Sequence, residues 1–152
     1  MKVEVATSED APEIARLGLL LHESSSYAAI PYRIEKVEDL MRNLTSGGGV
    51  VFVVRRDGEI VGGIAGAVTA HWFSDELHGF EFSFFLRPDA RSGITAGRLI
   101  NAFTTWCGLR GAKQVRVGIT TGINEERTGE FYRAIGFDPA GSLFKMEVSN
   151  GS

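Results

Sequence analysis

The stretch that decides the fold reads Phe84-Phe85-Leu86-Arg87-Pro88-Asp89-Ala90-Arg91-Ser92-Gly93-Ile94-Thr95-Ala96-Gly97-Arg98-Leu99-Ile100. An apolar strand runs through a proline turn into small residues and then directly into an amphipathic helix. The first turn of a helix has N–H groups without intrahelical partners and lies at the positive end of the dipole. Small side chains leave these groups accessible, and here they belong to Ser92, Gly93, Thr95, Ala96 and Gly97. The segment is predicted to cradle an anion such as a pyrophosphate; the alternative is that it only lets a helix start close to a strand.

The helix after this turn has one apolar stripe, formed by Ala96, Leu99, Ile100, Phe103, Trp106 and Cys107. Their spacing is that of a helix with one buried face. Arg110 and Gly111 mark its end, since glycine readily adopts the left-handed conformation of a C-terminal cap. Cys107 on the stripe is expected to be a small buried hydrophobe and not a reactive thiol.

The order of residues in this stretch resembles the signature of the GNAT superfamily of acyl-CoA-dependent N-acyltransferases, Val-x-Pro-x-x-Arg/Gln-x-x-Gly-x-Gly/Ala-x-x-Leu. The matching positions are Leu86, Pro88, Arg91, Ala96 and Leu99. One position departs from the signature, because Ile94 stands where the family has its first glycine and Gly93 lies one place earlier. This departure implies a shifted backbone path around the anion.

A second resemblance lies in residues 124–137, which begin with Asn124 and end in the pattern Tyr-x-x-x-Gly-Phe, here Tyr132 to Phe137. This segment is similar to the last helix of the same family, and the expected strand over 114–119 separates it from the signature. With weaker agreement over residues 3–11, the resemblance covers nearly the whole chain.

The expected elements follow from periodicity and from turn residues. Strands are predicted over 3–5, 50–54, 60–68, 80–86, 115–119 and 143–148, with an Asp57-Gly58 hairpin turn. Helices are predicted after a Ser8 cap with Pro12 in the first turn, around 37–44, from 96 onward and over 125–135. The resemblance implies one domain over 1–152 with an α/β (α+β) GNAT fold. In that fold a mixed, mainly antiparallel sheet of six to seven strands has helices on both faces and a splay between its two central strands.

Composition and charge exclude several classes of function. The chain of 152 residues is expected to form one domain that buries about 70% of its unfolded surface. A formal charge of −3 without a Lys/Arg run argues against nucleic-acid binding. Neither a membrane span nor a signal peptide is indicated, so a cytoplasmic protein is expected. His22, His71 and His78 lack metal-ligand spacing, so no metal site is expected.

Acyl transfer from a thioester to an amine needs a base for the amine, a donor that polarises the carbonyl and an acid for the leaving thiolate. The resemblance implies that Tyr132 directs its hydroxyl at the cofactor sulfur; the alternative is a tyrosine packed through its ring. Glu81 is the candidate base, because its phenylalanine neighbours would desolvate the carboxylate and raise its pKa. Strand alternation could instead turn Glu81 to solvent.

The resemblance also assigns the acyl donor, acetyl-CoA. Its pantetheine arm would bond like an added strand to backbone groups of Phe84, Phe85 and Leu86. Asn124 would bind the same arm, although a helix cap alone would explain this residue. The pyrophosphate would lie against Arg91, Ser92, Gly93, Ile94, Thr95, Ala96 and Gly97.

The acceptor in this fold is covered by the link between the first two helices and by the loop before the signature strand. Glu23, Tyr27 and His71 are the candidate substrate-binding residues there. Acidic side chains such as Asp75 and Glu76 would favour a cationic amine if they converge, whereas solvated surface acids are the alternative.

The sequence therefore predicts an N-acetyltransferase that moves an acetyl group from acetyl-CoA to a primary amine of a small molecule or peptide by direct attack. No metal, nucleic acid or membrane is expected as a partner, and a homodimer is compatible with the resemblance. The alternative is a non-catalytic CoA-binding module that acts as a sensor or assembly partner, favoured if Ile94 blocks the cradle. A Rossmann domain is disfavoured, because Gly-x-Gly-x-x-Gly is absent and a hairpin breaks the βαβ order.

Overall fold

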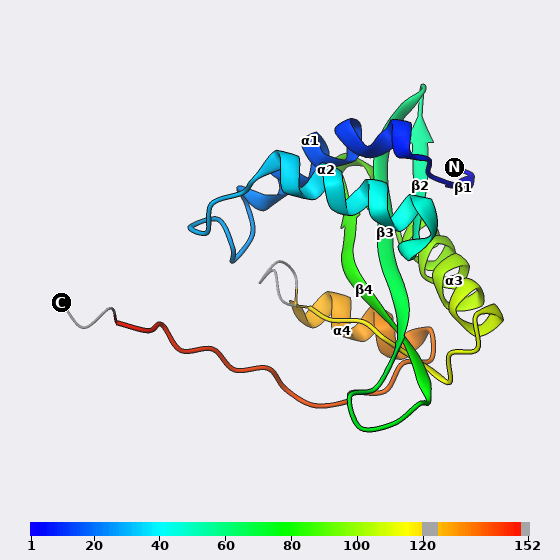
Figure 1. Ribbon diagram of the computed structural model, residues 1–152. Helices are drawn as coiled ribbons and strands as arrows, with labels where there is room; N and C mark the ends of the chain where they lie inside the picture. The colour runs from blue at the N-terminus through cyan, green and yellow to red at the C-terminus, as the bar shows by residue number, and fades with distance from the viewer. Residues whose placement is uncertain (120–124, 150–152) are drawn as a thin grey trace.

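The computed structural model describes residues 1–119 and 125–149, and its centre is one twisted sheet (Figure 1). The five strands follow one another across the sheet in chain order. They are β1 Val3–Val5, β2 Val50–Arg56, β3 Glu59–Ala70, β4 Leu77–Leu86 and β5 Gln114–Arg116. The first four pair antiparallel, and β5 pairs parallel to β4. The mixed, mainly antiparallel sheet is therefore confirmed.

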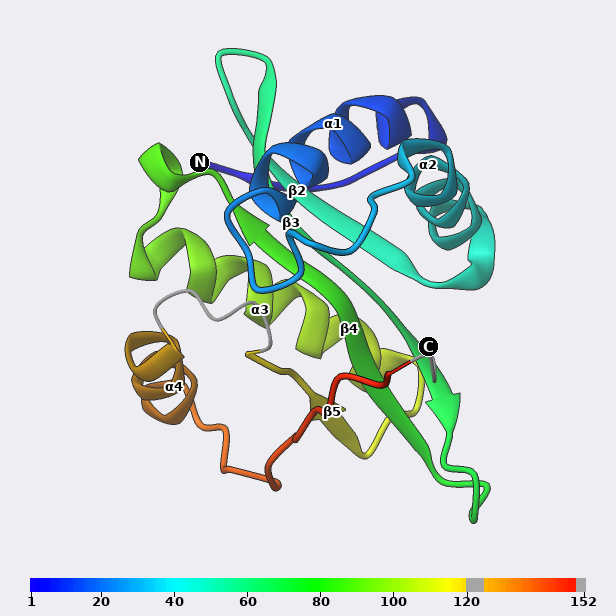
Figure 2. The same cartoon turned by 90° about the vertical axis from the view of Figure 1, so that its left-hand side faces the viewer.

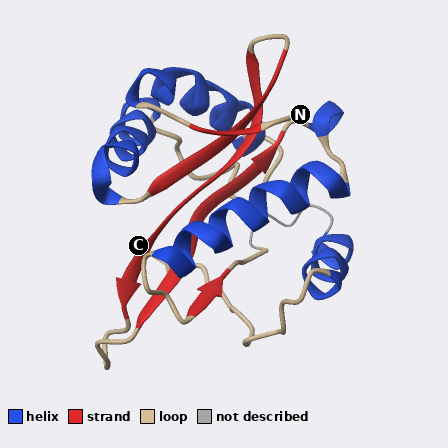
Figure 3. Ribbon diagram, turned by 90° about the vertical axis from the view of Figure 1, so that its right-hand side faces the viewer, coloured by secondary structure: helices blue, strands red, loops and turns tan. Residues whose placement is uncertain are grey.

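The helices are α1 Ala11–His22, α2 Ile34–Asn43, α3 Gly93–Leu109 and α4 Glu125–Ala134. Figure 2 shows α1 and α2 together, and Figure 3 shows α3 packed in front of the sheet. Alternate side chains of β2 separate two apolar cores, because successive strand residues point to opposite faces. Val51 and Val53 pack in the core with α1 and α2, whereas Phe52 and Val54 pack in the core with α3. Among the described residues, no helix combines the length and apolar character needed to cross a membrane.

Local signals predicted several element ends correctly. Asp57 and Gly58 both have positive φ, 52° and 82°, as the tight hairpin turn between β2 and β3 requires. Gly111 caps the end of α3 with φ of 88°. The predicted Ser8 cap is wrong, because Ser8 belongs to a short 3-10 turn and α1 begins at Ala11 after Asp10. There Thr7 N–H donates to the Asp10 carboxylate at 2.9 Å, which closes the turn before the helix.

Two predicted strands differ from the structure. The strand expected over 115–119 is shorter in the structure, where β5 spans Gln114–Arg116 and pairs with β4 over these residues. The strand expected over 143–148 does not form: this segment has no strand assignment and leads away from the sheet (Figure 1, red). Leu143, Phe144, Met146 and Val148 are 80% to 90% exposed there, because the segment has no neighbouring strand. The described residues therefore form a five-stranded sheet and not the six to seven strands expected.

A β-bulge interrupts β4 where its pairing with β5 ends. Ala65 pairs with Ser83 and Gly66 with Glu81, so Phe82 is an extra residue on β4. The last pair between β4 and β5 is Phe80 with Arg116. A bulge kinks a strand and increases its twist. Beyond Phe80, β4 therefore continues to Leu86 with no strand paired to that edge in the described part of the chain.

The close packing of α3 on the sheet makes Gly66 sensitive to substitution. A Cβ on Gly66 would overlap the Phe103 ring of α3 and the Phe80 carbonyl oxygen, whereas a Cβ on Gly97 meets nothing within 4 Å. We expect Gly66→Ala to lower the free energy of unfolding by about 1–3 kcal/mol through overpacking. Gly97→Ala should raise it by about 0.5–1 kcal/mol, as is usual inside a helix. Urea unfolding of both variants measures the difference, and equal midpoints would contradict this account of the packing.

Candidate active site

The N-terminal turn of α3 follows β4 through the 3-10 turn Pro88–Ala90. Ser92 is the N-cap: its Oγ accepts the Thr95 N–H at 3.1 Å, and its carbonyl accepts the Ala96 N–H at 3.0 Å. The N–H groups of Gly93 and Ile94 precede the first intrahelical bond and so have no acceptor within the helix. The turn thus presents two backbone donors at the positive end of a 17-residue helix.

The side chains around this turn leave space next to it. A Cβ on Gly93 or on Gly97 would meet no atom within 4 Å. Ile94, at the position where the signature has glycine, is 71% exposed and does not pack beneath the turn. Arg91 donates from Nε to the Leu86 carbonyl at 3.1 Å, so it ties the end of β4 to the start of the turn. The open surface and free donors are what a pyrophosphate site requires.

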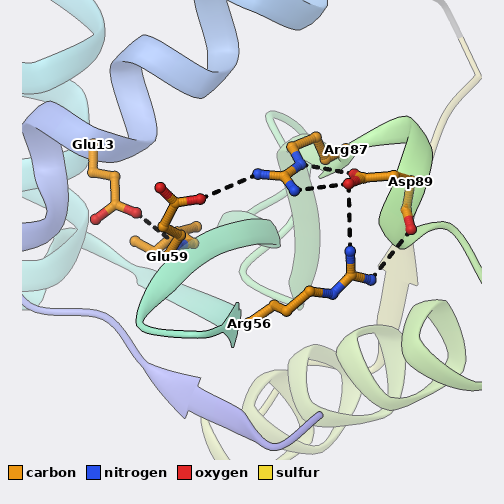
Figure 4. A network of polar contacts seen from close by, with 6 residues as sticks. Glu13, Arg56, Glu59, Arg87 and Asp89 are labelled. Carbon is orange, nitrogen blue, oxygen red and sulfur yellow. Dashed lines mark hydrogen bonds and ion pairs between the residues drawn. The ribbon is translucent and has the colours of Figure 1, made fainter.

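An ion-pair network that the sequence did not reveal holds the same turn in place (Figure 4). Arg87 donates twice to the Asp89 carboxylate, with both N···O distances 2.7 Å, and also reaches Glu59 at 3.4 Å. Arg56 donates to the Asp89 carboxylate at 3.4 Å and to its backbone carbonyl at 3.2 Å. The hydrogen bonds from Arg87 lower the pKa of Asp89 to about 2. Because Arg56 and Glu59 flank the β2–β3 turn, the network links that hairpin to the approach to α3.

Glu81 and Tyr132 meet at one peptide group, although 51 positions separate them in the chain. Glu81 Oε1 accepts the Gly118 N–H at 3.1 Å, and the Tyr132 hydroxyl faces the Gly118 carbonyl at 3.5 Å. Gly118 follows β5 beyond the last pair with β4, so a glutamate side chain bridges the two segments where strand pairing has stopped. The alternative that Glu81 points freely into solvent is wrong, and nothing in the sequence singled out Gly118.

The surroundings shift the pKa values of both groups upward. Burial raises the pKa of Glu81 to about 7, against the opposing effect of the Gly118 N–H. Burial, and then the negative charge of Glu81, raise the pKa of Tyr132 far above that of an ordinary phenol. Glu81 therefore exchanges a proton near neutral pH, whereas Tyr132 remains a hydrogen-bond donor.

The β4 residues predicted to bind the acyl donor point to opposite faces of the sheet. Phe85 is buried in the core with α1 and α2, whereas Phe84 and Leu86 pack against the core that contains α3. Their backbone edge toward β5 carries no paired strand in the described residues. Asn124 lies outside the described residues.

The structure does not gather the predicted acceptor residues. Glu23 is the C-cap that follows α1, and exposed Tyr27 lies in the link to α2, where its backbone N–H donates to Ser25 Oγ. His71 follows β3 and stacks on His78 with ring centroids 4.2 Å apart. Within residues 1–119 and 125–149, no hydrogen bond or ring contact joins Glu23, Tyr27 or His71 to Glu81.

Two further side-chain expectations concern cysteine and metal. Cys107 is buried in the α3 core, and this burial raises its pKa to about 11, as expected for an inert thiol. The described part of the chain contains no cluster of three His, Cys, Asp or Glu side chains that could hold a metal ion.

Comparisons with known proteins agree with this architecture. The family model described as the acetyltransferase (GNAT) family matches residues 18–137. No curated protein sequence matches the chain.

Among solved structures, the chain is similar to an aminoglycoside acetyltransferase from an uncultured soil metagenomic sample, with 20% identity, a TM-score of 0.71 and coverage of 98% of this chain and 100% of that one. It is also similar to the ribosomal-protein-alanine N-acetyltransferase of Brucella melitensis biovar Abortus 2308, with 15% identity, a TM-score of 0.70 and coverage of 97% and 100%. A third similar structure is AAC(6')-Iy in complex with a bisubstrate analog, CoA-S-monomethyl-acetylneamine, with 13% identity, a TM-score of 0.75 and coverage of 97% of each chain. At these identities the similarity is one of fold.

The raised pKa of Glu81 predicts how stability depends on pH. A folded-state pKa of about 7, above the usual value of about 4.5, means that the folded protein holds a proton that the unfolded chain releases. Stability should therefore fall as pH rises between these two values and stay lower above pH 7. Glu81→Gln should remove this loss, so its free energy of unfolding should increase relative to wild type from pH 5 to pH 8. Urea unfolding at several pH values measures this; parallel curves would contradict the assigned burial of Glu81.

Proposed function

The chain belongs to the GNAT family of acetyltransferases, and from this premise we propose that it transfers an acetyl group from acetyl-CoA to a primary amine of a small molecule or peptide. The observation that carries the proposal is the meeting of Glu81 and Tyr132 at Gly118, where β4 and β5 part. One of these groups accepts a proton near neutral pH and the other donates a hydrogen bond. Acyl transfer to an amine requires both capacities.

The donor site fits acetyl-CoA by its chemistry. The N–H groups of Gly93 and Ile94 and the space beside Gly93 and Gly97 suit a pyrophosphate. The unpaired edge of β4 near Phe84 and Leu86 offers backbone groups to an extended amide-containing arm. Acetyl-CoA supplies an activated thioester, so that the N–C bond to the acceptor forms as the C–S bond breaks.

Glu81 acts as the base for the acceptor amine. An alkylammonium group has a pKa near 10.4, so it must lose a proton before it can attack. A carboxylate with a pKa of about 7 is partly ionised at neutral pH and accepts that proton directly or through water. The Gly118 N–H holds Oε1 at 3.1 Å, which leaves Oε2 for the amine.

Tyr132 serves the leaving sulfur. Among the described residues its hydroxyl makes one long contact, 3.5 Å to the Gly118 carbonyl, so rotation of the O–H toward a thiolate costs little. Its ring contacts Phe131 and Phe137, which fix the side chain while the hydroxyl turns. The proton that completes the thiol comes from this hydroxyl or from water.

The similar structures support an amine acceptor without selecting one class. One is named for aminoglycosides and another for the alanine of a ribosomal protein. A CoA-binding module without turnover would share the donor site but would not need the Glu81–Gly118–Tyr132 arrangement. Release of thiol in the presence of an amine therefore separates the two functions.

Acetyl-CoA should stabilise the folded protein, because its site exists only after folding. At free ligand 100-fold above Kd the gain is about 2.7 kcal/mol, which raises the melting temperature by several degrees. Gly93→Glu should abolish the shift by placing a carboxylate in open space beside the anion site, whereas Gly93→Ala should retain it. Thr95 is unsuitable for this test because it is buried. A full shift in Gly93→Glu would place the donor elsewhere.

Removal of the Tyr132 hydroxyl should slow turnover and leave donor affinity unchanged. We expect Tyr132→Phe to lower kcat by ~10²-fold, within the range usual for acid–base groups. In both proteins kcat/KM should rise as pH increases through about 7, where Glu81 ionises. Steady-state thiol release between pH 6 and 9 provides the measurement. Tyr32→Phe is the matched control, because that hydroxyl bonds the Ala15 carbonyl within the α1 region. Unchanged kcat in Tyr132→Phe would remove this residue from the mechanism.

A further inference from the structure

Asp89 lies at the centre of the ion-pair network in Figure 4, four positions before Gly93. Its carboxylate accepts two hydrogen bonds from Arg87 at 2.7 Å. Arg56 donates to the same carboxylate at 3.4 Å and to the Asp89 backbone carbonyl at 3.2 Å. A paired set of bonds between a guanidinium and a carboxylate fixes the orientation of both groups as well as their distance. Both the side chain and the backbone of Asp89 are therefore held, by arginines at the ends of β2 and β4.

Three residues connect Asp89 to the two N–H donors at the start of α3, and each of them is anchored. Ala90 is buried in the core that contains α3. Arg91 donates to the Leu86 carbonyl, and Ser92 caps the helix. Because none of the three is a free linker, a displacement of Asp89 also displaces the N–H donors that follow.

The guanidinium groups of the network are occupied by carboxylates. Arg87 uses Nε and one terminal nitrogen on Asp89, and its other terminal nitrogen lies 3.4 Å from the Glu59 carboxylate. Arg56 uses both terminal nitrogens on Asp89. The two positive and two negative formal charges cancel. These arginines therefore support the turn from behind, in contrast to arginines that bind a phosphate directly.

From these contacts, we propose that Asp89 is a positioning residue for the acyl donor: held by Arg87 and Arg56, it fixes the N-terminal turn of α3 in the orientation that binds the pyrophosphate. It acts through the backbone of residues 90–94. The inference rests on the proposed function for the identity of the donor, whereas the binding that it predicts does not require turnover.

The sign of the effect of Asp89→Asn separates positioning from simple electrostatics. The change removes a negative charge near the site of an anionic ligand, and this loss alone would tighten binding. It also replaces one of the two oxygens that accept from Arg87 by an NH2 group, so the turn is held less firmly and binding weakens. Positioning predicts that the second effect dominates. The Kd for CoA and the KM for acetyl-CoA should both rise about tenfold, within the range usual for residues of one network, while kcat stays unchanged.

Isothermal titration calorimetry with CoA and steady-state thiol release with acetyl-CoA test the proposal. Asp89→Glu, which retains a carboxylate, should recover part of the affinity. Glu59→Gln removes the same charge where a single 3.4 Å contact is at stake, so it should change the Kd by about twofold or less. Asp39→Asn is the matched remote control, because this α2 carboxylate accepts from Arg42 at 3.3 Å, and it should change nothing.

Stability and pH dependence distinguish positioning from a general structural role. Exposed ion pairs contribute little to global stability, and the Asp89 side chain is 57% exposed. Asp89→Asn should therefore shift the melting temperature of the ligand-free protein by no more than about 4 °C. The pKa of Asp89 is about 2, so its carboxylate is ionised throughout the assay range and the rise in KM should be the same from pH 6 to pH 9.

Several outcomes would overturn the positioning role. They are equal or tighter CoA binding by Asp89→Asn, equal weakening in Glu59→Gln, a lower kcat with unchanged KM, or a much larger loss of ligand-free stability. Weaker CoA binding by Asp89→Asn, in a protein that releases no thiol with any amine, would uphold the positioning role and contradict the proposed function. Wild type that does not bind CoA would contradict both.

Discussion

The extra residue at Phe82 is the constraint on which the site depends. Without it, β4 would keep a single alternation of faces from Leu77 to Leu86. The extra residue lies in the pairing of β4 with β3, just beyond Phe80 and Arg116, the last pair of β4 with β5. Past this point the other edge of β4 is unpaired among the described residues. The bulge therefore lies beside both the edge proposed to take the acyl donor and Glu81, which reaches Gly118 from the preceding position.

Partial burial of the Glu81 carboxylate costs free energy, and the Gly118 peptide group offsets part of this cost. A half-buried carboxylate without a partner would be strongly destabilising, and the Gly118 N–H offsets part of that penalty. The remaining penalty appears as the raised pKa of Glu81. The same peptide presents its carbonyl to Tyr132, so one backbone unit sets the distance between a proton acceptor and a hydroxyl donor.

The two sides of β4 carry different chemistry. Toward α3 lie the capped helix turn and the Glu81–Gly118–Tyr132 arrangement, with the turn braced by the Arg87–Asp89 pair and by Arg56. Away from α3, the rings of His71, His78, Phe80 and Phe82 form a row of successive contacts.

Local signals in the sequence determined the elements that depend on neighbouring residues. Asp57-Gly58 predicted the hairpin turn, the spacing from Ala96 to Cys107 predicted α3, and the small residues after Arg91 predicted its open N-terminal turn. Each depends on backbone geometry or on one helix face within a few positions. The alternation over 143–148 predicted a strand that does not form, because a strand needs a partner edge and alternation alone does not supply one.

Only the tertiary structure decided which way Glu81 points, that Gly118 receives it, and that rings from His71 to Phe82 form one row. A bulge changes which face each later residue of β4 occupies, and its position follows from the pairing with β3. Contacts such as those of Gly118 join segments dozens of residues apart, so they follow from how the strands and helices pack and not from local pattern.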